Sequence, residues 1–503
     1  MMKQLKYIAF ALLLMGATTS CEDFLTVSSP DELTSDSFWR DKDDAEAGLA
    51  AAYSKLEAST DTWEFAEVKW PVEAYREDIV DLGSDALNYQ NWVELANFTY
   101  TNGNSQFSAY WRDNYYGINF SNQVIENVAE IPAEGISEED RAMIQNEAYF
   151  LRAYYHMKLL LNWERIVVRD TYISSADQLD KALSSREEAW DFIIGDLTKA
   201  TALPATRTSE AMGRATRGAA YAFLGWAHLT RAYEGSSKDA DLNAAVAALN
   251  NVTGYSLVKD FKSMFDGTNR NSSEGIFELQ LTLNTDNGAR YRTQLHRWIG
   301  VSELWGWDEI LPSQRLMDEF KKEGKTATTG RYDSRLYETI FFKDDYFNDS
   351  DAARVYSHTY DYWFDGADKP AFRKYMPVDF EGLDMNYFAP NIVLMRYANV
   401  LLMKAEALNE LGKTAEAIPL INEVRARADM PAMTGTSQEQ VRAQIEHERI
   451  IEFPLENFRF YDLRRWGKTK AALDAVNRST FDPAKHNFYP IPIQEVNTNN
   501  AID

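Results

Sequence analysis

The chain has 503 residues, of which 52 are Lys or Arg and 77 are Asp or Glu, so its formal net charge at pH 7 is −25. A negative field of this size repels nucleic acid and anionic membrane surfaces, which excludes a nucleic-acid-binding function. The hydrophobic fraction of 45% is ordinary for a folded protein, but 13 Trp, 27 Tyr and 26 Phe are many aromatic residues. Such residues indicate either core packing or a flat surface for a ligand.

The first 21 residues have the pattern of a secretory signal. Lys3 and Lys6 precede the apolar run 7–17, and small or hydroxylated residues follow it up to Ser20. A short positive segment, an apolar core of roughly 7–15 residues and a small-residue cleavage site are typical of such a signal. Because the run is well short of the roughly 20 residues that span a bilayer, a membrane-spanning helix is the weaker interpretation.

Cys21 is the only cysteine of the chain, which favours an acylated cysteine. A protein that used disulfides outside the cell would need a second cysteine, and a free thiol there would be exposed to oxidation. The stretch 18–21 resembles a bacterial lipoprotein signal, with Thr18 where Leu or another aliphatic residue is usual. We therefore predict that residues 1–20 are removed and that Cys21 carries the lipid.

Helical periodicity dominates the next long region. Residues 143–163 are apolar on nearly all sides and are therefore expected to form a buried helix. Their expected partner is a helix within 186–204, which ends at a proline. Residues 213–235 and 241–254 carry Ala and Gly at the spacing that lets two helices approach closely. These segments predict a scaffold of packed helices.

Two stretches between the helical regions differ from them in composition. Residues 60–105 and 256–391 are rich in Asn, Asp, Gly, Tyr and Trp and lack sustained periodicity. Within them, residues 275–283 have the pattern of a strand. Long loops that persist in a compact protein are usually functional, so we expect the binding site on these insertions.

The last helical region resembles a tetratricopeptide unit, which consists of two helices in about 34 residues. One apolar stripe runs from Leu394 to Leu411, Gly412 breaks the helix, and a second stripe runs from Ala417 to Val424. Similar pairs are far apart in the sequence, which predicts helix pairs stacked in space with long insertions between them. A further helix is expected from Thr436, which has capping-box spacing to a glutamate three residues later.

Motifs for catalysis and metal binding are incomplete. The three Gly-Lys-Thr triplets lack the glycine that a phosphate-binding loop needs five residues earlier, and His447 lacks the second histidine of a zinc motif. Residues 348–354 offer oxygens to calcium, but a solvated acidic loop is the favoured interpretation. We therefore expect no metal and no cofactor. Paired carboxylates of a glycoside hydrolase stay open, because the sequence does not pair its 77 acids.

Together the segments resemble the SusD/RagB family of outer-membrane lipoproteins of Bacteroidetes, and the similarity is spread over the whole chain. The segments that resemble the family's motifs, in order, are 21–56, 110–128, 146–163, 214–233, 311–336, 394–412, 421–431, 448–468 and 487–499. One departure is "FPLENFRF" at 453–460, where the family usually has Glu-Gly-x-Arg. We interpret that turn as structural.

The resemblance implies a fold and a function. The fold is mainly α, with tetratricopeptide-like helix pairs as scaffold and a loop-rich ligand-binding region with little β structure. The function is that of a surface-exposed, lipid-anchored outer-membrane protein that captures oligo- or polysaccharide and delivers it to a partner TonB-dependent, SusC-like transporter, without catalysis. Two alternatives stay open, namely peptide capture of the RagB type and, as the weaker one, a glycoside hydrolase.

The expected organisation is a signal peptide at 1–20 followed by a single unit at 21–503. The helical scaffold is expected mainly at 36–60, 105–255 and 392–475. The loop-rich ligand-binding insertions are expected at about 60–105 and 256–391.

A sugar-binding site needs flat aromatic rings for the C–H faces of the sugar and polar side chains for its hydroxyl groups. Two stretches have this composition, 73–95 and 290–312, and a third candidate is 360–366. The candidate residues of the first stretch are Arg76, Asp78, Tyr89, Asn91 and Trp92. Those of the second stretch are Arg290, Tyr291, Trp298, Trp305 and Trp307.

Each candidate has a plainer interpretation, because a single Trp in a chain of this length is usually part of the core. If Trp305-Gly306-Trp307 is extended, alternate side chains point to opposite sides, and one Trp is expected to be exposed and the other buried. The basic residues Arg459, Arg464 and Arg465 are expected to pair with acids and pack the C-terminal helices, and not to form an anion site.

Overall fold

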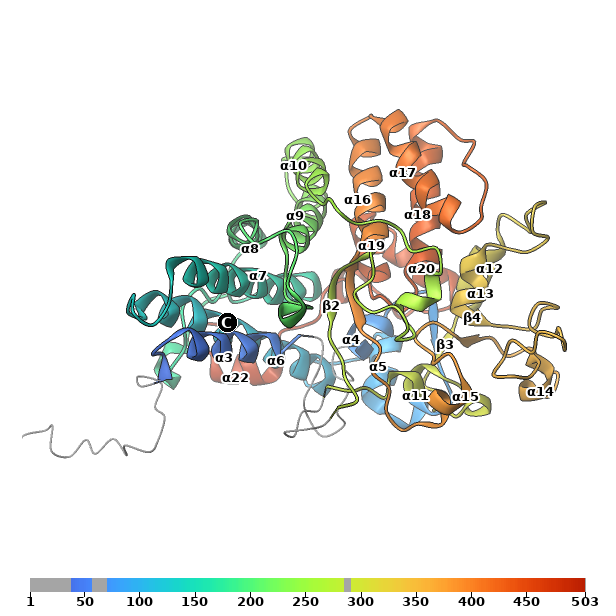
Figure 1. The fold of residues 1–503 in the computed structure, drawn as a ribbon, viewed down its shortest axis with the longest axis horizontal. Helices are drawn as coiled ribbons and strands as arrows, with labels where there is room; N and C mark the ends of the chain where they lie inside the picture. The colour runs from blue at the N-terminus through green and yellow to red at the C-terminus, as the bar shows by residue number, and fades with distance from the viewer. Residues whose placement is uncertain (1–37, 57–69, 285–290, 503) are drawn as a thin grey trace, which may run out of the picture.

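The computed structural model describes residues 38–56, 70–284 and 291–502, and helices dominate them (Figure 1). Helix accounts for 52% and strand for 6%, which confirms the prediction of a mainly α fold with little β structure. None of the helices in the described ranges combines the length and the apolar character needed to span a bilayer. The predicted signal at 1–20 and Cys21 lie outside these ranges.

The first half of the scaffold is a series of helices in which each packs against the next (Figure 1). The long helix α6 lies against both α3 and α7, after which α7 packs on α8, α8 on α9 and α9 on α10. Their bounds are α3 (Lys42–Tyr53), α6 (Ser105–Glu130), α7 (Glu138–Asn162), α8 (Arg186–Ala200), α9 (Arg217–Ala232) and α10 (Lys238–Asn250).

Local sequence explains where these helices begin and how closely they pack. Ser137 accepts a hydrogen bond from the backbone of Asp140 at the start of α7, and three acids in the first turn suit the helix dipole. The predicted burial of 143–163 is confirmed, because nearly every residue from Ile144 to Asn162 is buried. A Cβ at Gly225 of α9 would lie 2.5 Å from Leu249 of α10, so this glycine permits the predicted close approach.

The second half of the scaffold continues the same stack. Helix α10 packs on α16 (Tyr397–Glu410), which packs on α17 (Thr414–Arg427) and α18 (Gln438–Glu452). Gly412 has φ +75°, a left-handed conformation that ends α16 and starts the turn to α17. The predicted tetratricopeptide-like helix pairs are therefore present, and they are stacked in space although long insertions separate them in the sequence.

Two predicted boundaries in this half are wrong. Leu394 was expected in the helical stripe, but it belongs to strand β6 (Ile392–Arg396), and α16 begins three residues later. The cap of α18 is not Thr436 but Ser437, which forms a capping box with Gln440. Both errors arise because an apolar stripe and an S/T-x-x-E/Q spacing leave the register open by a few residues.

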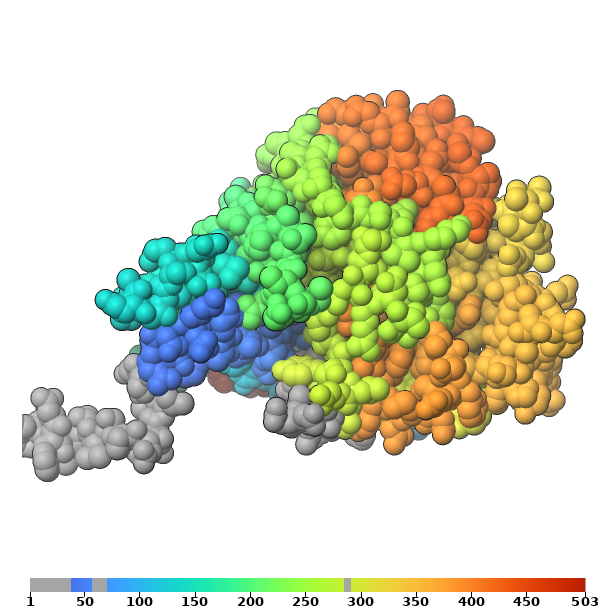
Figure 2. Space-filling view, in the orientation of Figure 1, coloured from blue at the N-terminus to red at the C-terminus, as the bar shows by residue number. Residues whose placement is uncertain are grey.

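Short elements make up the loop-rich region, and its part from α12 to α14 forms the right-hand end of the molecule (Figure 1, and Figure 2 in yellow to light orange). Among the described residues it pairs β1 with β3, β2 with β6 and β4 with β5, each antiparallel. The strand expected at 275–283 is confirmed as β2, although it ends at Leu279. The bounds are α4 (Trp70–Ala74), β1 (Val80–Leu82), η3 (Ala86–Asn88), α5 (Gln90–Asn97), η6 (Phe261–Met264), β2 (Gly275–Leu279), α11 (Leu295–Ile299), η8 (Ser302–Leu304), β3 (Ile310–Pro312), α12 (Gln314–Lys321), α13 (Ser334–Thr339), β4 (Ile340–Phe341), α14 (Tyr360–Phe364), β5 (Ala371–Phe372) and α15 (Phe380–Asp384).

Buried ion pairs join the loop-rich region to the scaffold. Arg335 of α13 donates to Glu448 and Glu452 of α18 at 2.7 Å each. Arg396, at the end of β6, donates to Glu274 at 2.7 Å and to Glu456 at 2.8 Å. Because these charges have no access to water, each depends on its partners to offset the desolvation of the ionised form.

The turn at 453–460 is part of this network. Leu455 and Asn457 have φ of 61° and 62°, and between them Glu456 points to Arg396 and to Lys374, whose Nζ lies 2.6 Å from its carboxylate. The departure from the family's usual Glu-Gly-x-Arg therefore lies in a buried, ion-paired turn, which agrees with its interpretation as structural.

The C-terminal elements close the molecule. They comprise α19 (Arg459–Arg465), α20 (Thr469–Ala475), α21 (Pro483–His486) and α22 (Ile493–Thr498). Arg459 pairs with Asp78 at 2.7 Å and Arg465 pairs with Glu406 at 2.8 Å, as predicted. Arg464 differs, because it donates to the backbone carbonyls of Leu161 and Asn487, and burial lowers its pKa to about 9.

One continuous core of buried residues runs from Ala45 to Tyr489, and a small second cluster lies around Phe98 and Phe481. The single unit at 21–503 stays a prediction, as do the exact domain boundaries.

Candidate functional site

The first predicted group is largely interior. Arg76, Asp78 and Trp92 are all at most 2% exposed. The Arg76 guanidinium lies 4.1 Å from the centre of the Phe460 ring and donates to Asn162. Asp78 accepts two hydrogen bonds from Arg459, and Trp92 packs against Tyr75 and Tyr89. Such burial is incompatible with direct contact to a surface ligand.

Two members of that group reach the surface. Tyr89 is 44% exposed, and its ring lies on Trp92 with 4.3 Å between the centroids. Asn91 is half-buried, and its amide donates to Ser105 at 2.7 Å. The stretch was expected to be loop, but α5 presents Trp92, Leu95 and Ala96 to the core.

The second group divides in the same way. Trp298 is buried, and its ring meets the rings of Trp70 and Tyr75 edge-on. Like Trp92, it therefore has no direct access to a ligand at the surface. Tyr291 is 37% exposed and lines a separate hollow of about 250 Å³ beside Arg214. Arg290 lies outside the described residues.

Trp305 and Trp307 are both exposed, at 39% and 36%, which contradicts the expectation of one buried and one exposed ring. The segment is a tight turn and not an extended strand. Trp305 has φ +58°, and the Gly306 amide donates to Val301 at 2.8 Å. A Cβ at Gly306 would lie 1.9 Å from the backbone of Gly300, so only glycine fits there.

Trp305 belongs to a surface cluster of rings that comes from three different short elements. Its ring meets Trp363 of α14 at 5.4 Å and 77°, and Phe380 of α15 at 5.0 Å and 90°. We call Trp305, Trp363, Phe380 and the adjoining Tyr362 the aromatic cluster. Phe380 is 42% exposed and Tyr362 is 61% exposed, so the rings face solvent.

The third candidate stretch, 360–366, therefore contributes two of the four rings. Tyr362 is also stacked on His358, with 3.8 Å between centroids and 7° between planes. Sequence reasoning missed Phe380 and His358. Phe380 sits in a polar segment without a periodic pattern, and His358 is a single histidine, so neither gave a usable signal.

Hydrogen bonds to the backbone hold the cluster rigid. Arg297, which is buried, donates to the Trp305 carbonyl at 2.5 Å and to the Asp384 carbonyl at 2.8 Å, which ties the Trp305 turn to α15. The Trp363 indole N–H donates to the Val355 carbonyl at 2.7 Å. Aromatic rings fixed in this way lose little entropy when a ligand binds.

The surroundings of the cluster are acidic. Lys369 is held by Glu303 at 2.7 Å and by Asp308 at 2.9 Å. Burial opposes the charge of Asp308, but hydrogen bonds from Ser302 and Lys369 outweigh it and lower the pKa of this carboxyl. Exposed acids on the same elements and their flanks are Asp361, Asp365, Asp368, Asp379, Glu381 and Asp384.

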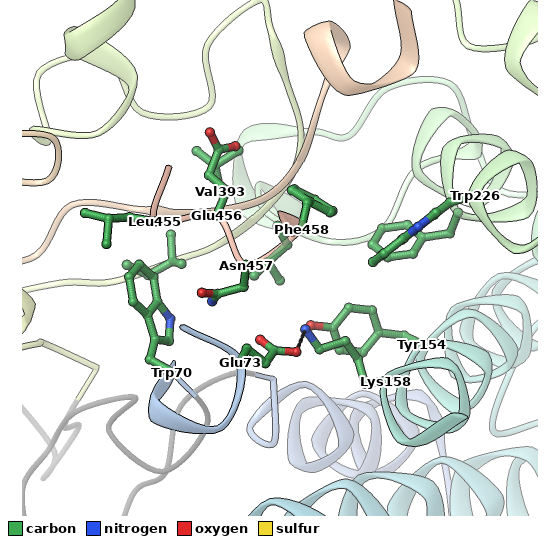
Figure 3. A pocket seen from close by; sticks show the side chains of 13 residues that line it. Trp70, Glu73, Tyr154, Lys158, Trp226, Val393, Leu455, Glu456, Asn457 and Phe458 are labelled. Carbon is green, nitrogen blue, oxygen red and sulfur yellow. Dashed lines mark ion pairs between the residues drawn. The ribbon is translucent and has the colours of Figure 1, made fainter. Parts of the chain in front are cut away.

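An interior cavity near Trp70 is not a ligand site. It has a volume of about 30 Å³, about that of one water molecule in the liquid. Figure 3 shows Glu73 and Lys158 in direct contact at its wall, where their ion pair measures 2.6 Å. Asn457, from the turn 453–460, points into the same space (Figure 3).

Two places suggested metal binding. The ligand atoms of Glu323, His447 and Glu448 converge, but Arg425 donates to Glu323 at 2.9 Å and to Glu448 at 2.6 Å, so a guanidinium already supplies the positive charge there. In the acidic loop 348–354, Asp349 accepts two backbone N–H groups and pairs with Arg354 at 2.9 Å. Neither arrangement favours a metal ion.

Comparison with known proteins places this geometry in context. The profile of the SusD family matches residues 273–503, and a profile described as "Starch-binding associating with outer membrane" matches residues 23–229. The SusD-like protein P2 of Formosa agariphila is 27% identical over 489 residues, which cover 92% of this chain and 90% of that protein.

Solved structures agree over nearly the whole chain. A SusD superfamily protein of Bacteroides vulgatus superposes with a TM-score of 0.79 at 28% identity, and the match covers 93% of this chain and 99% of that one. A structure described as a laminarin-binding SusD-like protein has a TM-score of 0.73 at 23% identity and covers 92% and 99%. At that identity the second match establishes the fold alone.

Proposed function

The chain belongs to the SusD/RagB family, and from this premise we propose that it captures oligo- or polysaccharide at the cell surface and passes it to a SusC-like TonB-dependent transporter. The family includes glycan-binding proteins that associate with the outer membrane. The observation that carries the proposal for this chain is the aromatic cluster of Trp305, Trp363, Phe380 and Tyr362.

The geometry of the cluster suits the faces of sugar rings. Trp305 stands edge-on to Trp363 and Phe380, so the rings form a stepped surface and not a single plane. Tyr362, the most exposed of them, extends the surface over α14. Fixed, exposed rings of this kind stack on the C–H faces of pyranoses, and the neighbouring Glu303, Asp308 and Lys369 offer hydrogen-bond partners to hydroxyl groups.

The charge around the cluster supports a neutral glycan as the ligand. Six exposed acids lie on α14, α15 and their flanks, and the ammonium of Lys369 is already held by two carboxylates. An anionic polysaccharide would meet uncompensated repulsion there. Starch and laminarin, which appear in the descriptions of similar proteins, are both neutral glucans.

Attachment and delivery complete the proposal. Cys21 would carry the lipid anchor that tethers the protein to the outer membrane, with the folded part exposed at the cell surface. The SusC-like transporter would receive the glycan. We propose no catalytic step, and the four described carboxyls with a raised pKa, Glu77, Glu147, Glu278 and Glu423, all lie on elements outside the aromatic cluster.

Binding to an array of neutral and acidic polysaccharides tests the proposal. The full-length protein is expected to bind at least one neutral glycan, and the variant Trp305→Ala/Tyr362→Ala to lose most of that binding. The bound glycan is then incubated with the protein and its length is followed by chromatography. No binding to any polysaccharide would refute glycan capture, and the release of shorter products would favour the glycoside hydrolase.

A further inference from the structure

A large groove lies on a part of the molecule away from the aromatic cluster. It is bounded by α6, by α22 and by the segment 169–179, and its volume is about 690 Å³. In Figure 1, α22 and α6 lie toward the left and α14 toward the far right of the long axis. The volume falls in the range of roughly 300–1,000 Å³ that is usual for small-molecule sites.

The wall of the groove on α6 is aromatic and rigid. Trp111 and Tyr115 have ring centroids 4.9 Å apart, and both line the groove. The Trp111 indole donates to Glu495 of α22 at 3.1 Å, and the Tyr115 hydroxyl donates to the Val167 carbonyl at 2.8 Å. Both rings are therefore fixed before any ligand arrives.

One ring of this wall is open to solvent. Tyr116 is 49% exposed and lines the groove next to Arg112. The Lys55 ammonium lies 5.6 Å from the centre of the Tyr116 ring, which covers one part of it. The remaining exposed part is a surface on which a ring-shaped ligand can stack.

Polar groups with unused hydrogen-bonding capacity lie beside the rings. The Arg112 guanidinium is half exposed and meets Asp113 through Nε at 3.1 Å. Gln494 of α22 is exposed on the opposite side of the groove.

The charges that line the groove and the helices that form its walls indicate which class of ligand fits. Arg112 is offset by its ion pair with Asp113, and the lining holds one further cation, Arg169, and one carboxylate, Glu495. The Arg169 guanidinium donates to the carbonyls of Gln178 and Leu179. The groove is therefore close to neutral. Two of its walls are helices, whose backbone groups are already bonded, so it offers no strand edge to which an extended peptide could pair.

We propose that this groove is a second saccharide-binding site, which takes a short neutral oligosaccharide or the end of a longer chain. The ring of the sugar stacks on Tyr116, and its hydroxyl groups accept from Arg112 and pair with the exposed amide of Gln494. The site needs none of the residues of the aromatic cluster. Two sites at opposite ends of one protein would hold a polysaccharide at two points.

The test separates the two sites by working in the background Trp305→Ala/Tyr362→Ala, in which the aromatic cluster is disabled. The full-length protein is mixed with four neutral hexasaccharides, namely those of the malto, laminari, xylo and manno series. Saturation-transfer NMR then detects contact with each sugar, and titration gives the Kd of those that bind.

At least one hexasaccharide is expected to bind in this background. Tyr116→Ala should raise its Kd about fivefold or more, the lower end of what loss of one aromatic stacking surface produces. Arg112→Gln should also weaken binding, whereas Tyr116→Phe, which keeps the ring, should bind as the background does. Because Tyr116 is exposed, its replacement should leave the fold intact, and circular dichroism of each variant checks this.

Two results would overturn the proposal. One is that no hexasaccharide shows saturation transfer at concentrations up to about 10 mM, the weakest binding of interest. The other is that Tyr116→Ala and Arg112→Gln leave the Kd unchanged. Because the wild-type protein is measured in parallel, a failure of the groove is distinguished from a failure of the aromatic cluster.

Discussion

The rings of Trp363 and Phe380 lie nearly parallel, at 14°, with 6.1 Å between their centroids, although one belongs to α14 and the other to α15. Trp305 meets both rings edge-on, at 77° and 90°. Three short elements that are separate in the sequence, η8, α14 and α15, thus build one surface. The backbone hydrogen bonds of Arg297 to Trp305 and Asp384 hold two of these elements together.

Replacing Trp305 by Ala is expected to weaken glycan binding by roughly 1–3 kcal/mol, the range found for a lost aromatic stacking contact. The ring is 39% exposed, so folding should change little. Isothermal titration with the bound glycan measures the effect. Met212→Ala is the matched control, because Met212 is 50% exposed but lies on another hollow. Equal affinity of Trp305→Ala and wild type would remove Trp305 from the site.

Removing negative charge beside the cluster is expected to relax the discrimination against anionic glycans. In the triple variant Asp361→Asn/Asp365→Asn/Glu381→Gln, three exposed acids become neutral while the rings stay in place. Binding of an oligouronate should strengthen severalfold at low salt and much less at physiological salt, where the Debye length is about 8 Å. Affinity for the neutral glycan should stay the same. If wild type binds the oligouronate as tightly as the neutral glycan, the assignment of a neutral ligand fails.

Much of the scaffold could be predicted from the sequence because its signals are local. Ser137 caps α7, the apolar residues from Ile144 to Asn162 mark a buried helix, and Gly412 marks the end of α16. The errors at Leu394 and Thr436 are shifts of a few residues. They do not change which helices exist or how they are paired.

The site was harder to predict because exposure depends on contacts between distant segments. Trp92 and Trp298 lie, like Trp305, in stretches rich in aromatic and polar residues, but both are buried and pack against Tyr75. By residue type Asp78 is suited to bind a sugar hydroxyl, but in the folded protein its carboxylate accepts from Arg459, which lies 381 residues later in the chain. No local pattern distinguishes a Trp in the core from a Trp on the surface in an aromatic, polar stretch.

The buried network around Arg396 is expected to be essential for folding. Arg396→Met would remove one of the two cations that each carboxylate contacts, which leaves Glu456 with Lys374 and Glu274 with Arg427 in a region with no access to water. Losing one partner of a buried ion pair typically destabilises a protein by about 3–5 kcal/mol. Urea unfolding followed by tryptophan fluorescence measures the change. The control Arg354→Met removes a partly exposed pair with Asp349 and should change stability by less than about 1 kcal/mol.

Acid should destabilise the protein partly through Glu319. Burial opposes the charge of Glu319, but hydrogen bonds from His447 and Lys322 outweigh it and lower its pKa to about 2. Because this pKa is depressed in the folded state, its contribution is present above the ordinary pKa near 4.5 and is lost as pH falls toward 2. The loss should be about 2 kcal/mol. Unfolding midpoints between pH 6 and 3 should fall less steeply in Glu319→Gln; parallel curves would contradict this role.

The lipid anchor can be tested separately from the fold because Cys21 precedes the described residues. Cys21→Ala removes the only thiol of the chain and therefore the only site for thioether lipidation. The variant is expected to move from the membrane fraction to the soluble fraction, and to bind glycan with unchanged affinity once purified. Cell fractionation with immunodetection, together with mass spectrometry of the N-terminal peptide, gives the result. Ser28→Thr, which lies outside the predicted signal, is a control that keeps both the cleavage site and the thiol. Continued membrane retention of Cys21→Ala at wild-type level would mean that another contact, and not a lipid on Cys21, holds the protein at the membrane.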